Sequence, residues 1–165
     1  METRTDQEAK DKVLELLKDI NIAMMATHGD SGQMHARPMA TNTAEFDGDL
    51  WFFTDKDSPK IREIERNSEV LLTYANENKQ HYISIQGEAE VVHDQAKVDE
   101  LWSEPLRVWF PKGKTDESIV LIKVRVESAE YWDSPSSTMI HLYGYVKALA
   151  TGERPNPGDS ASVRF

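Results

Sequence analysis

A long alternating segment over residues 80–92 constrains the fold of this chain most strongly. One side of an extended backbone there carries only apolar residues, Ile83, Ile85, Ala89 and Val91, while polar residues fall on the other side. Gly87 lies in the middle of the segment, which is typical of a β-bulge or of a tight bend in a barrel strand. The pattern predicts one long, bent strand with a single buried face.

Further strands are predicted from apolar runs or alternation bounded by turn formers, at residues 22–27, 33–40, 51–53, 70–75, 119–127 and 140–149. Pro38 lies inside one of them and cannot donate to a sheet ladder, so we expect it at an edge or a bulge. Few connections between the strands have helical length. The sequence therefore favours a mainly β fold, a closed barrel with peripheral helices, over a doubly wound sheet.

Three helices are predicted around these strands. The first runs from a capping box at Thr5 and Glu8 to about Ile20, the second follows Ser58, and the third runs from Asp94 to about Trp102. The apolar face of the first helix is predicted to consist of Val13, Leu14, Leu17 and Ile20. Residues 1–150 are expected to form one domain, and residues 151–165 a C-terminal tail without a core of its own.

Charge and composition exclude several classes of function. The net charge of −10 argues against a nucleic-acid surface and disfavours binding to an anionic membrane. The chain has no cysteine, so disulfides and thiolate chemistry are excluded. Neither an apolar signal core nor a membrane-spanning segment appears, and we expect a cytoplasmic protein.

The start of the second predicted helix has an unusual charge. Ser58 suits the N-cap and Pro59 the first helical position, but the first turn then carries Lys60, where the helix dipole disfavours a cation. Free N–H groups, a hydroxyl and a lysine at a helix start together make a phosphate site. The alternative interpretation is a surface lysine on an ordinary capped helix.

Other chemistry-bearing residues form no recognisable motif. The five histidines, at positions 28, 35, 81, 93 and 141, include no pair with helical i, i+4 spacing, so no metal site is expected. Glu88 and Glu90 fall on the solvent side of their strand, and no catalytic acid or base is identified. Because successive side chains alternate along a strand, His35, Arg37 and Met39 share one face.

Five short motifs occur in one order along the chain: Ala36-Arg37-Pro38-Met39, Phe53-Thr54, Ser58-Pro59-Lys60, Gly87-Glu88-Ala89-Glu90 and Tyr131-Trp132-Asp133. In this order and strand context they resemble the pyridoxamine-phosphate-oxidase-like split barrels that bind FMN, and within them the general stress protein branch. The resemblance covers roughly residues 9–151. It implies a six-stranded antiparallel split barrel that forms a homodimer, with two non-covalent FMN sites at the subunit interface.

The resemblance also implies roles for residues on two strands. Arg37, Pro38 and Met39 match the strand that runs beside the flavin. Phe53 and Thr54 match the strand end that meets the isoalloxazine ring and the ribityl chain. An apolar slot with a few polar groups and a cation for the phosphate is what a flavin requires.

The remaining matches concern the phosphate and the second subunit. Ser58, Pro59 and Lys60 match the phosphate end of the site. Trp132 matches an aromatic residue that the second subunit brings to the cofactor, and Tyr82 falls near a family glutamine that touches the ring. The tyrosine departs from the family type, so this last match rests on position alone.

Two departures bear on the reaction. Where the true pyridoxamine phosphate oxidases have an arginine and lysine pair at the phosphate, Pro59 replaces the arginine. Their later motif of arginine and histidine residues, which holds the substrate phosphate, is missing after Trp132, where only His141 lies near. Oxidation of vitamin B6 is therefore disfavoured.

Together these observations favour an FMN-binding general stress protein that acts as a flavin-dependent oxidoreductase, with FAD as the alternative flavin and NAD(P)H as a candidate electron donor. A non-catalytic flavin-binding or redox-sensing protein is the alternative function. A split barrel that holds haem or a deazaflavin is a third hypothesis. The sequence does not identify the substrate, nor does it show whether the protein turns over a substrate at all.

Overall fold

The computed structural model describes residues 6–42, 48–133, 149, 151–152 and 159–165. Within these residues the helices are α1 (Asp6–Lys18), α2 (Pro59–Arg66), α3 (Gln95–Leu101) and the short 3-10 helices η1 (Glu104–Val108) and η2 (Gly113–Thr115). The strands are β1 (Ile22–His28), β2 (Met34–Asn42), β3 (Asp49–Asp55), β4 (Glu69–Asn76), β5 (His81–Val92), β6 (Ile119–Asp133) and β7 (Asp159–Arg164).

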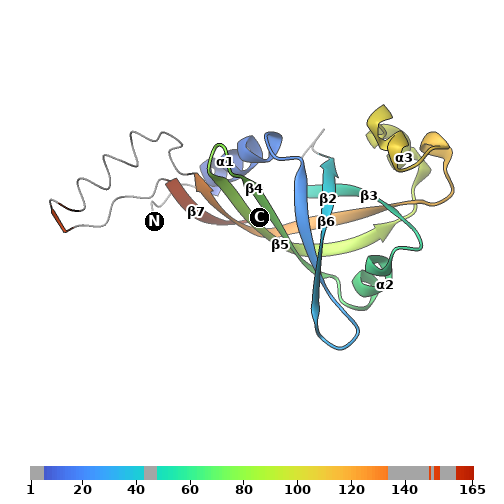
Figure 1. Cartoon of the computed structure of the whole chain (residues 1–165), viewed down its shortest axis with the longest axis horizontal. Coiled ribbons are helices and arrows are strands. Elements are labelled where there is room, and N and C mark those ends of the chain that lie inside the picture. The colour runs from blue at the N-terminus through green and yellow to red at the C-terminus, as the bar shows by residue number, and fades with distance from the viewer. Residues whose placement is uncertain (1–5, 43–47, 134–148, 150, 153–158) are drawn as a thin grey trace.

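Six of the strands close into an antiparallel barrel (Figure 1). The sheet runs in the order β3-β2-β1-β4-β5-β6-β7, and an additional pairing of β3 with β6 closes the ring. The first half of β6 pairs with β3 and its second half with β7, while β5 pairs with it along nearly its whole length. The predicted mainly β barrel with peripheral helices is confirmed.

The bend in β5 depends on Gly87. The register between β5 and β6 shifts between Gln86 and Gly87, as the sequence predicted. A Cβ atom at residue 87 would lie 2.4 Å from the backbone oxygen of Arg125, so no other residue fits without a backbone shift. Ile83, Ile85 and Ala89 point into the barrel on either side of the bend.

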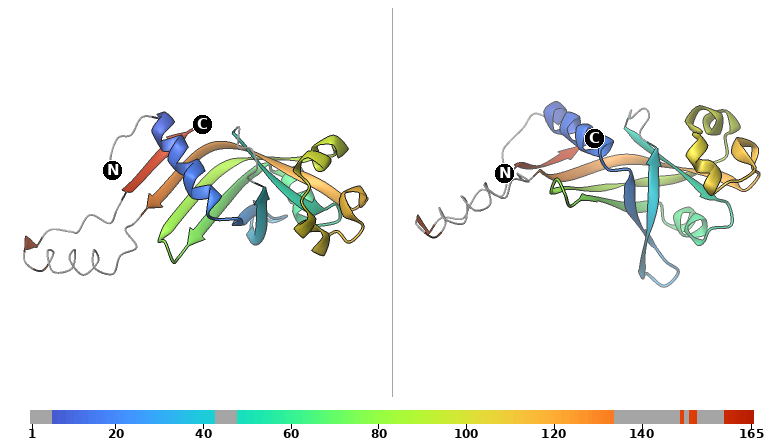
Figure 2. Two further views of the ribbon diagram at one scale, coloured as in Figure 1. Left: turned by 90° about the horizontal axis from the view of Figure 1, so that it is seen from above. Right: turned by 45° about the horizontal axis from the view of Figure 1, so that its top comes forward.

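Helix α1 lies across one end of the barrel, beside β7 (Figure 2). Its buried residues Ala9, Val13, Leu16 and Leu17, together with Ile20 just beyond its end, join the main hydrophobic core. The predicted apolar face was wrong in one position, because Leu16 is buried and Leu14 is only half-buried. The predicted cap residue Thr5 lies outside the described residues.

Helix α3 covers the outer wall of the barrel at the opposite end (Figure 1). Val98 and Leu101 pack against Leu121 of β6 and form a second, smaller cluster. The side chain of Asp94 accepts a hydrogen bond from the backbone N–H of Lys97, which confirms the predicted N-cap.

The end of the chain differs from the expected tail. Residues 159–164 form β7, which pairs with the second half of β6 and buries Ala161 and Val163. This segment joins the sheet because β6 extends beyond β3 and leaves an edge that another strand can pair with. The strand predicted at residues 140–149 lies almost entirely outside the described residues. None of the helices in the described ranges is long and apolar enough to cross a membrane.

Candidate functional site

The barrel is split along one edge of β2. That strand pairs with β1 from Ala40 to Met34, but with β3 only at Thr41 and Asn42. Pro38 therefore lies in a part of β2 that has a neighbouring strand on one side only, and its predicted position at an edge is confirmed. The gap leaves backbone and side chains of β2 accessible opposite the end of β3.

Helix α2 begins directly beyond this gap. Ser58 occupies the N-cap position and Pro59 the first turn, as predicted, but the Ser58 hydroxyl makes no capping hydrogen bond. That hydroxyl instead accepts a hydrogen bond of 2.6 Å from Nζ of Lys60. The same ammonium donates to Oγ1 of Thr54, at the end of β3, over 2.7 Å. Three of the predicted site residues, Thr54, Ser58 and Lys60, are thus in direct contact.

Lys60 is a half-buried cation without a carboxylate partner. Both of its hydrogen-bond acceptors are neutral hydroxyls, and no carboxylate of the described residues lies within ion-pair distance of its Nζ. Burial lowers the pKa of Lys60, and the nearby positive charge of Arg37 lowers it further; the more distant carboxylates of Asp55 and Glu63 act in the opposite direction without reversing the shift. A cation in this condition is stabilised by a bound anion.

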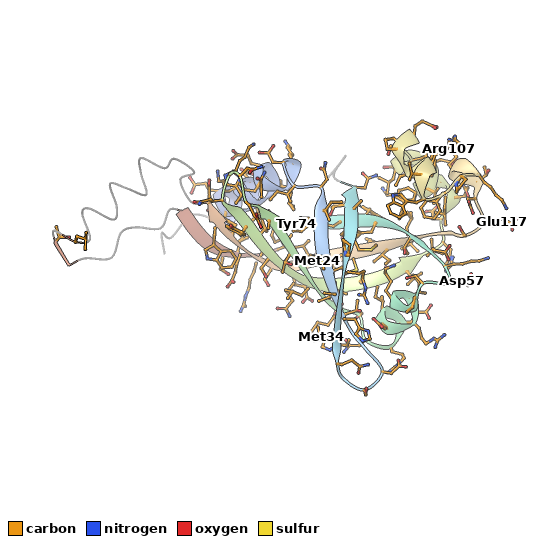
Figure 3. All side chains as sticks on the ribbon, viewed as in Figure 1. Met24, Met34, Asp57, Tyr74, Arg107 and Glu117 are labelled. Carbon is orange, nitrogen blue, oxygen red and sulfur yellow. The ribbon has the colours of Figure 1, made fainter. Side chains whose placement is uncertain are left out.

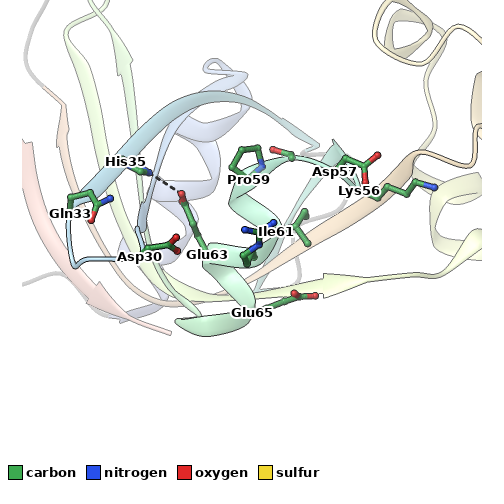
Figure 4. Close-up of a pocket in the computed structure, with 11 residues that line it drawn as sticks. Asp30, Gln33, His35, Lys56, Asp57, Pro59, Ile61, Glu63 and Glu65 are labelled. Carbon is green, nitrogen blue, oxygen red and sulfur yellow. Dashed lines mark hydrogen bonds and ion pairs between the residues drawn. The ribbon is translucent and has the colours of Figure 1, made fainter.

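Arg37, in contrast, is paired with a buried carboxylate. Its guanidinium donates to Oε2 of Glu63 over 3.0 Å and to Oγ1 of Thr27 over 2.6 Å. The Thr27 hydroxyl donates in turn to Oε2 of Glu63, and Nδ1 of His35 lies 2.9 Å from Oε1 of the same carboxylate. Glu63 thereby ties α2 to both arms of the β1–β2 hairpin, and Figure 4 shows its contact with His35.

The electrostatics of Glu63 follow from these contacts. Its side chain is only 6% exposed, and burial alone would raise its pKa. Hydrogen bonds from Thr27, His35 and Arg37 outweigh burial and hold the pKa at about 2. The carboxylate is therefore ionised at neutral pH and is no proton donor.

The sequence indicated part of this arrangement. It placed His35, Arg37 and Met39 on one face, and the structure brings His35 and Arg37 to Glu63, while Met39 continues that face into the core. Glu63 itself was missed. Its spacing of three residues from Lys60, which puts both on one side of a helix, was the available signal.

Phe53 and Thr54 point to opposite sides of β3, as adjacent strand residues do. Thr54 is buried on the side of Lys60. The Phe53 ring instead packs outside the barrel wall, edge-on to Trp102 at 6.1 Å between ring centroids and near Phe110 at 6.5 Å. The structure therefore brings the Thr54 side chain, but not the Phe53 ring, to the lysine.

Tyr82 and Trp132 are neighbours on the outer face of β5 and β6, 40% and 42% exposed. Thr54 pairs with Val120 of β6, and twelve residues separate Val120 from Trp132, which is about 40 Å of extended strand. One chain therefore does not bring Tyr82 and Trp132 to Lys60.

A cleft of about 430 Å³ lies between the β1–β2 hairpin and α2 (Figure 4). Ser58 and Pro59 line one side of it, and Asp30, Gln33 and His35 of the hairpin line the other. Arg37, Thr54 and Lys60 are not part of its lining. The cleft and the Lys60 site therefore meet at Ser58.

Comparisons with known proteins agree with this architecture. The family model Pyridoxamine 5'-phosphate oxidase like matches residues 8–156. The structure of general stress protein 26 from Jannaschia sp. CCS1 superposes with a TM-score of 0.75 at 24% identity, over 96% of this chain and 99% of that one. The general stress FMN/FAD binding protein of Xanthomonas citri gives a TM-score of 0.69 at 31% identity, over 79% of this chain and 92% of its own.

A relative with a curated sequence is protein bli-3 of Neurospora crassa. It is 24% identical over 141 residues, which are 79% of this chain and 68% of that protein. Both the matched range of the family model and the split-barrel fold lead to one conclusion: this chain belongs to the pyridoxamine 5'-phosphate oxidase-like family and resembles its general stress proteins.

Proposed function

We propose that this chain binds FMN non-covalently, with the phosphate at Lys60, and acts as a flavin-dependent oxidoreductase. The observation that carries the proposal is the half-buried ammonium of Lys60, which contacts two hydroxyls and no carboxylate of the described residues. Its place at the start of α2 adds the positive end of the helix dipole. Together these groups suit a phosphate ester.

The free edge of β2 beside the end of β3 offers polar groups to a flavin ring. Arg37, Pro38 and Met39 line the free part of β2, whose unpaired backbone groups can hydrogen-bond to the polar edge of an isoalloxazine. Thr54 ends the opposite strand beside Lys60. The bound flavin supplies hydride or single-electron transfer, while these residues orient it and fix its phosphate.

A homodimer would complete the site. Tyr82 and Trp132 lie far from Lys60 within one chain, so a second copy is needed to bring them to the flavin. Part of the outer face of four strands offers a suitable contact surface, and the face becomes acidic only beyond it, where Glu69 of β4 pairs with Glu88 of β5. This uncharged patch consists of residues without formal charge: Ile22, Met24, Ala26, Ala36, Pro38, Ala40, Leu71, Thr73, Ala75, Tyr82, Ser84 and Gln86. Figure 3 shows Met24 on β1 within this surface.

An uncharged patch of this extent is notable in a chain with a net charge of −10. Ile22, Met24 and Leu71 are 52%, 42% and 39% exposed, which costs free energy in a monomer. Like charges would repel two copies of this acidic chain at most other places. These features support a two-fold dimer through this face.

The phosphate assignment is tested by comparing FMN with riboflavin, which lacks the phosphate. In Lys60→Ala we expect FMN affinity to fall about tenfold or more, because a charge-assisted contact is lost. The riboflavin affinity of Lys60→Ala should change less than about twofold. As a control, Lys112→Ala, which replaces an exposed lysine, should bind both flavins like the wild type. Flavin-fluorescence titration measures the affinities of all three proteins for both flavins. Unchanged FMN affinity, or an equal loss for riboflavin, would remove Lys60 from the phosphate site.

One observation favours the non-catalytic alternative. Glu63, the buried carboxylate nearest the Lys60 site, is held ionised by Arg37 and its other donors and is unsuited to proton transfer. A flavin carrier or redox sensor needs no acid or base. Mixing the flavin-loaded protein with NADH or NADPH discriminates the two functions: bleaching of the flavin bands supports the oxidoreductase, and an unchanged spectrum supports the carrier.

A further inference from the structure

An exposed aromatic tip projects from the segment that follows α3. Val108, the last residue of η1, and Trp109 directly after it are 80% and 77% exposed, more than any other large apolar residue of the described ranges. A tryptophan left in water forgoes a large gain in free energy from burial. The flavin site proposed above makes no use of these two residues, which we call the tip.

The tip is held in place by contacts of its own segment. Arg107 donates to the two carboxylate oxygens of Glu104 over 2.9 and 3.2 Å, and to the backbone oxygen of Pro111 over 3.4 Å. A Cβ atom at Gly113 would lie 3.0 Å from Nη1 of Arg107, so the guanidinium packs closely on this glycine. Figure 3 shows Arg107 at the α3 end of the molecule. Because these contacts order the segment in advance, burial of Trp109 by a partner would cost little conformational entropy.

The tip borders the uncharged patch of the proposed dimer. Asn42 follows Ala40 on the outer face of β2, where the patch ends, and its side chain donates to the backbone oxygen of Leu101 in α3 over 2.8 Å. Phe110, next to the tip, is buried, and its ring centroid lies 6.5 Å from that of Phe53 on β3. The segment from α3 to the tip therefore begins where the β2 side of the patch ends. A second copy that covers the patch also lies beside this segment.

The opposite border of the patch carries two further exposed aromatic residues. The patch spans β2, β1, β4 and β5 in sheet order, and Tyr82 on β5 pairs with Trp132 on β6 at its far side. A two-fold dimer through the patch can bring each border either to the same border or to the opposite border of the partner. The proposed flavin site requires the second arrangement, because the partner's Tyr82 and Trp132 must reach the β2 side. In that arrangement they also meet the tip.

We propose that Trp109 packs against Tyr82 and Trp132 of a second copy of this chain, so that the dimer contains this aromatic contact twice. The inference rests on the proposed function, which requires a second copy to bring Tyr82 and Trp132 to the flavin. All three side chains are exposed in one chain. Aromatic residues of this kind are enriched at protein interfaces and dominate their energetics. Trp109 then holds the partner's aromatic pair beside the opening of the barrel.

The absence of cysteine from the chain allows a direct test by cross-linking. In Val108→Cys/Glu130→Cys one thiol lies next to Trp109 and the other on the same face as Trp132, while all three aromatic residues are kept. A short bismaleimide should convert this variant to a covalent dimer on a denaturing gel. Each single variant should remain a monomer on the gel. So should Leu149→Cys/Glu130→Cys, because Leu149 is comparably exposed, at 71%, but is not part of the proposed contact.

Truncation of the tip should weaken the dimer itself. In Trp109→Ala the dissociation constant of the dimer should rise about tenfold or more, because two aromatic contacts are lost in each dimer. Trp109→Phe should restore most of the affinity, and Leu149→Ala should change it less than about twofold. Sedimentation velocity over a range of protein concentrations measures these constants, and circular dichroism shows whether the variants keep the wild-type fold.

The outcomes separate this contact from the proposed function. A wild-type dimer in which Val108→Cys/Glu130→Cys gives no covalent dimer, or gives a ladder of higher oligomers, would overturn the contact and leave the dimer. An unchanged dissociation constant in Trp109→Ala would do the same. A wild-type protein that stays monomeric with FMN bound would overturn the dimer as well, and failure to bind FMN at all would overturn the proposed function itself.

Discussion

Two cations near the opening of the barrel differ in their hydrogen-bond partners. Arg37 on β2 donates to the buried carboxylate of Glu63, whereas Lys60 on α2 contacts only hydroxyls. The first pair joins the β1–β2 hairpin to α2 and is complete within one chain. The second arrangement leaves an ammonium without a carboxylate of the described residues at ion-pair distance. The difference indicates that one cation serves the fold and the other a ligand.

Removal of the Glu63 charge should give the largest effect on stability. In Glu63→Gln the guanidinium of Arg37 loses its counter-ion, and we expect the free energy of unfolding at pH 7 to fall by about 3 kcal/mol. Glu65→Gln, two residues along the same helix and exposed, should change it by less than about 0.5 kcal/mol. Urea denaturation of the two variants measures the contrast. Similar values for both would show that Glu63 is no more structural than a surface residue.

The pH dependence of stability should reveal the same carboxylate. Its pKa is lowered from 4.5 to about 2, so the folded state binds the proton less readily than the unfolded state. Its contribution is therefore fully present above about pH 4.5 and is lost as the pH falls toward 2. The difference in unfolding free energy between wild type and Glu63→Gln should shrink by about 2 kcal/mol between pH 7 and pH 3. A constant difference would place the pKa of Glu63 near its ordinary value.

Replacement of Lys60 should have the smallest effect on the flavin-free protein. Lys60→Met keeps an unbranched side chain one atom shorter and removes a half-buried charge whose burial is unfavourable. We expect the free energy of unfolding to rise, or to fall by no more than about 0.5 kcal/mol, because functional groups are often retained at the expense of stability. A loss as large as that in Glu63→Gln would erase the distinction between the two cations.

Local sequence rules were sufficient for part of the fold and the site. The order Ser58-Pro59-Lys60 after an aromatic strand placed a helix start, a hydroxyl and a cation together, and the alternation around Gly87 predicted the bent strand of the barrel. These features depend on neighbours in sequence. The predicted capping hydrogen bond of the Ser58 hydroxyl was wrong, because this hydroxyl accepts a hydrogen bond from Lys60 instead.

Features that depend on distant packing were missed. The sequence of helix α2 does not show that the β1–β2 hairpin folds against this helix. It therefore does not show that Glu63 is buried beside Thr27 and Arg37. Strand β7 forms because β6 extends beyond its partner β3, a fact that the short alternation of Ala161 and Val163 does not reveal. Both depend on which edges and surfaces the barrel leaves open.

The central claim is that the opening beside Lys60 holds a flavin phosphate. The most direct measurement is the visible absorbance spectrum of purified protein after addition of excess FMN and desalting, with Lys60→Ala treated in parallel. We predict a retained two-band flavin spectrum for the wild type and loss of most of it for the variant. A colourless wild-type protein, or equal retention by both proteins, would contradict the claim.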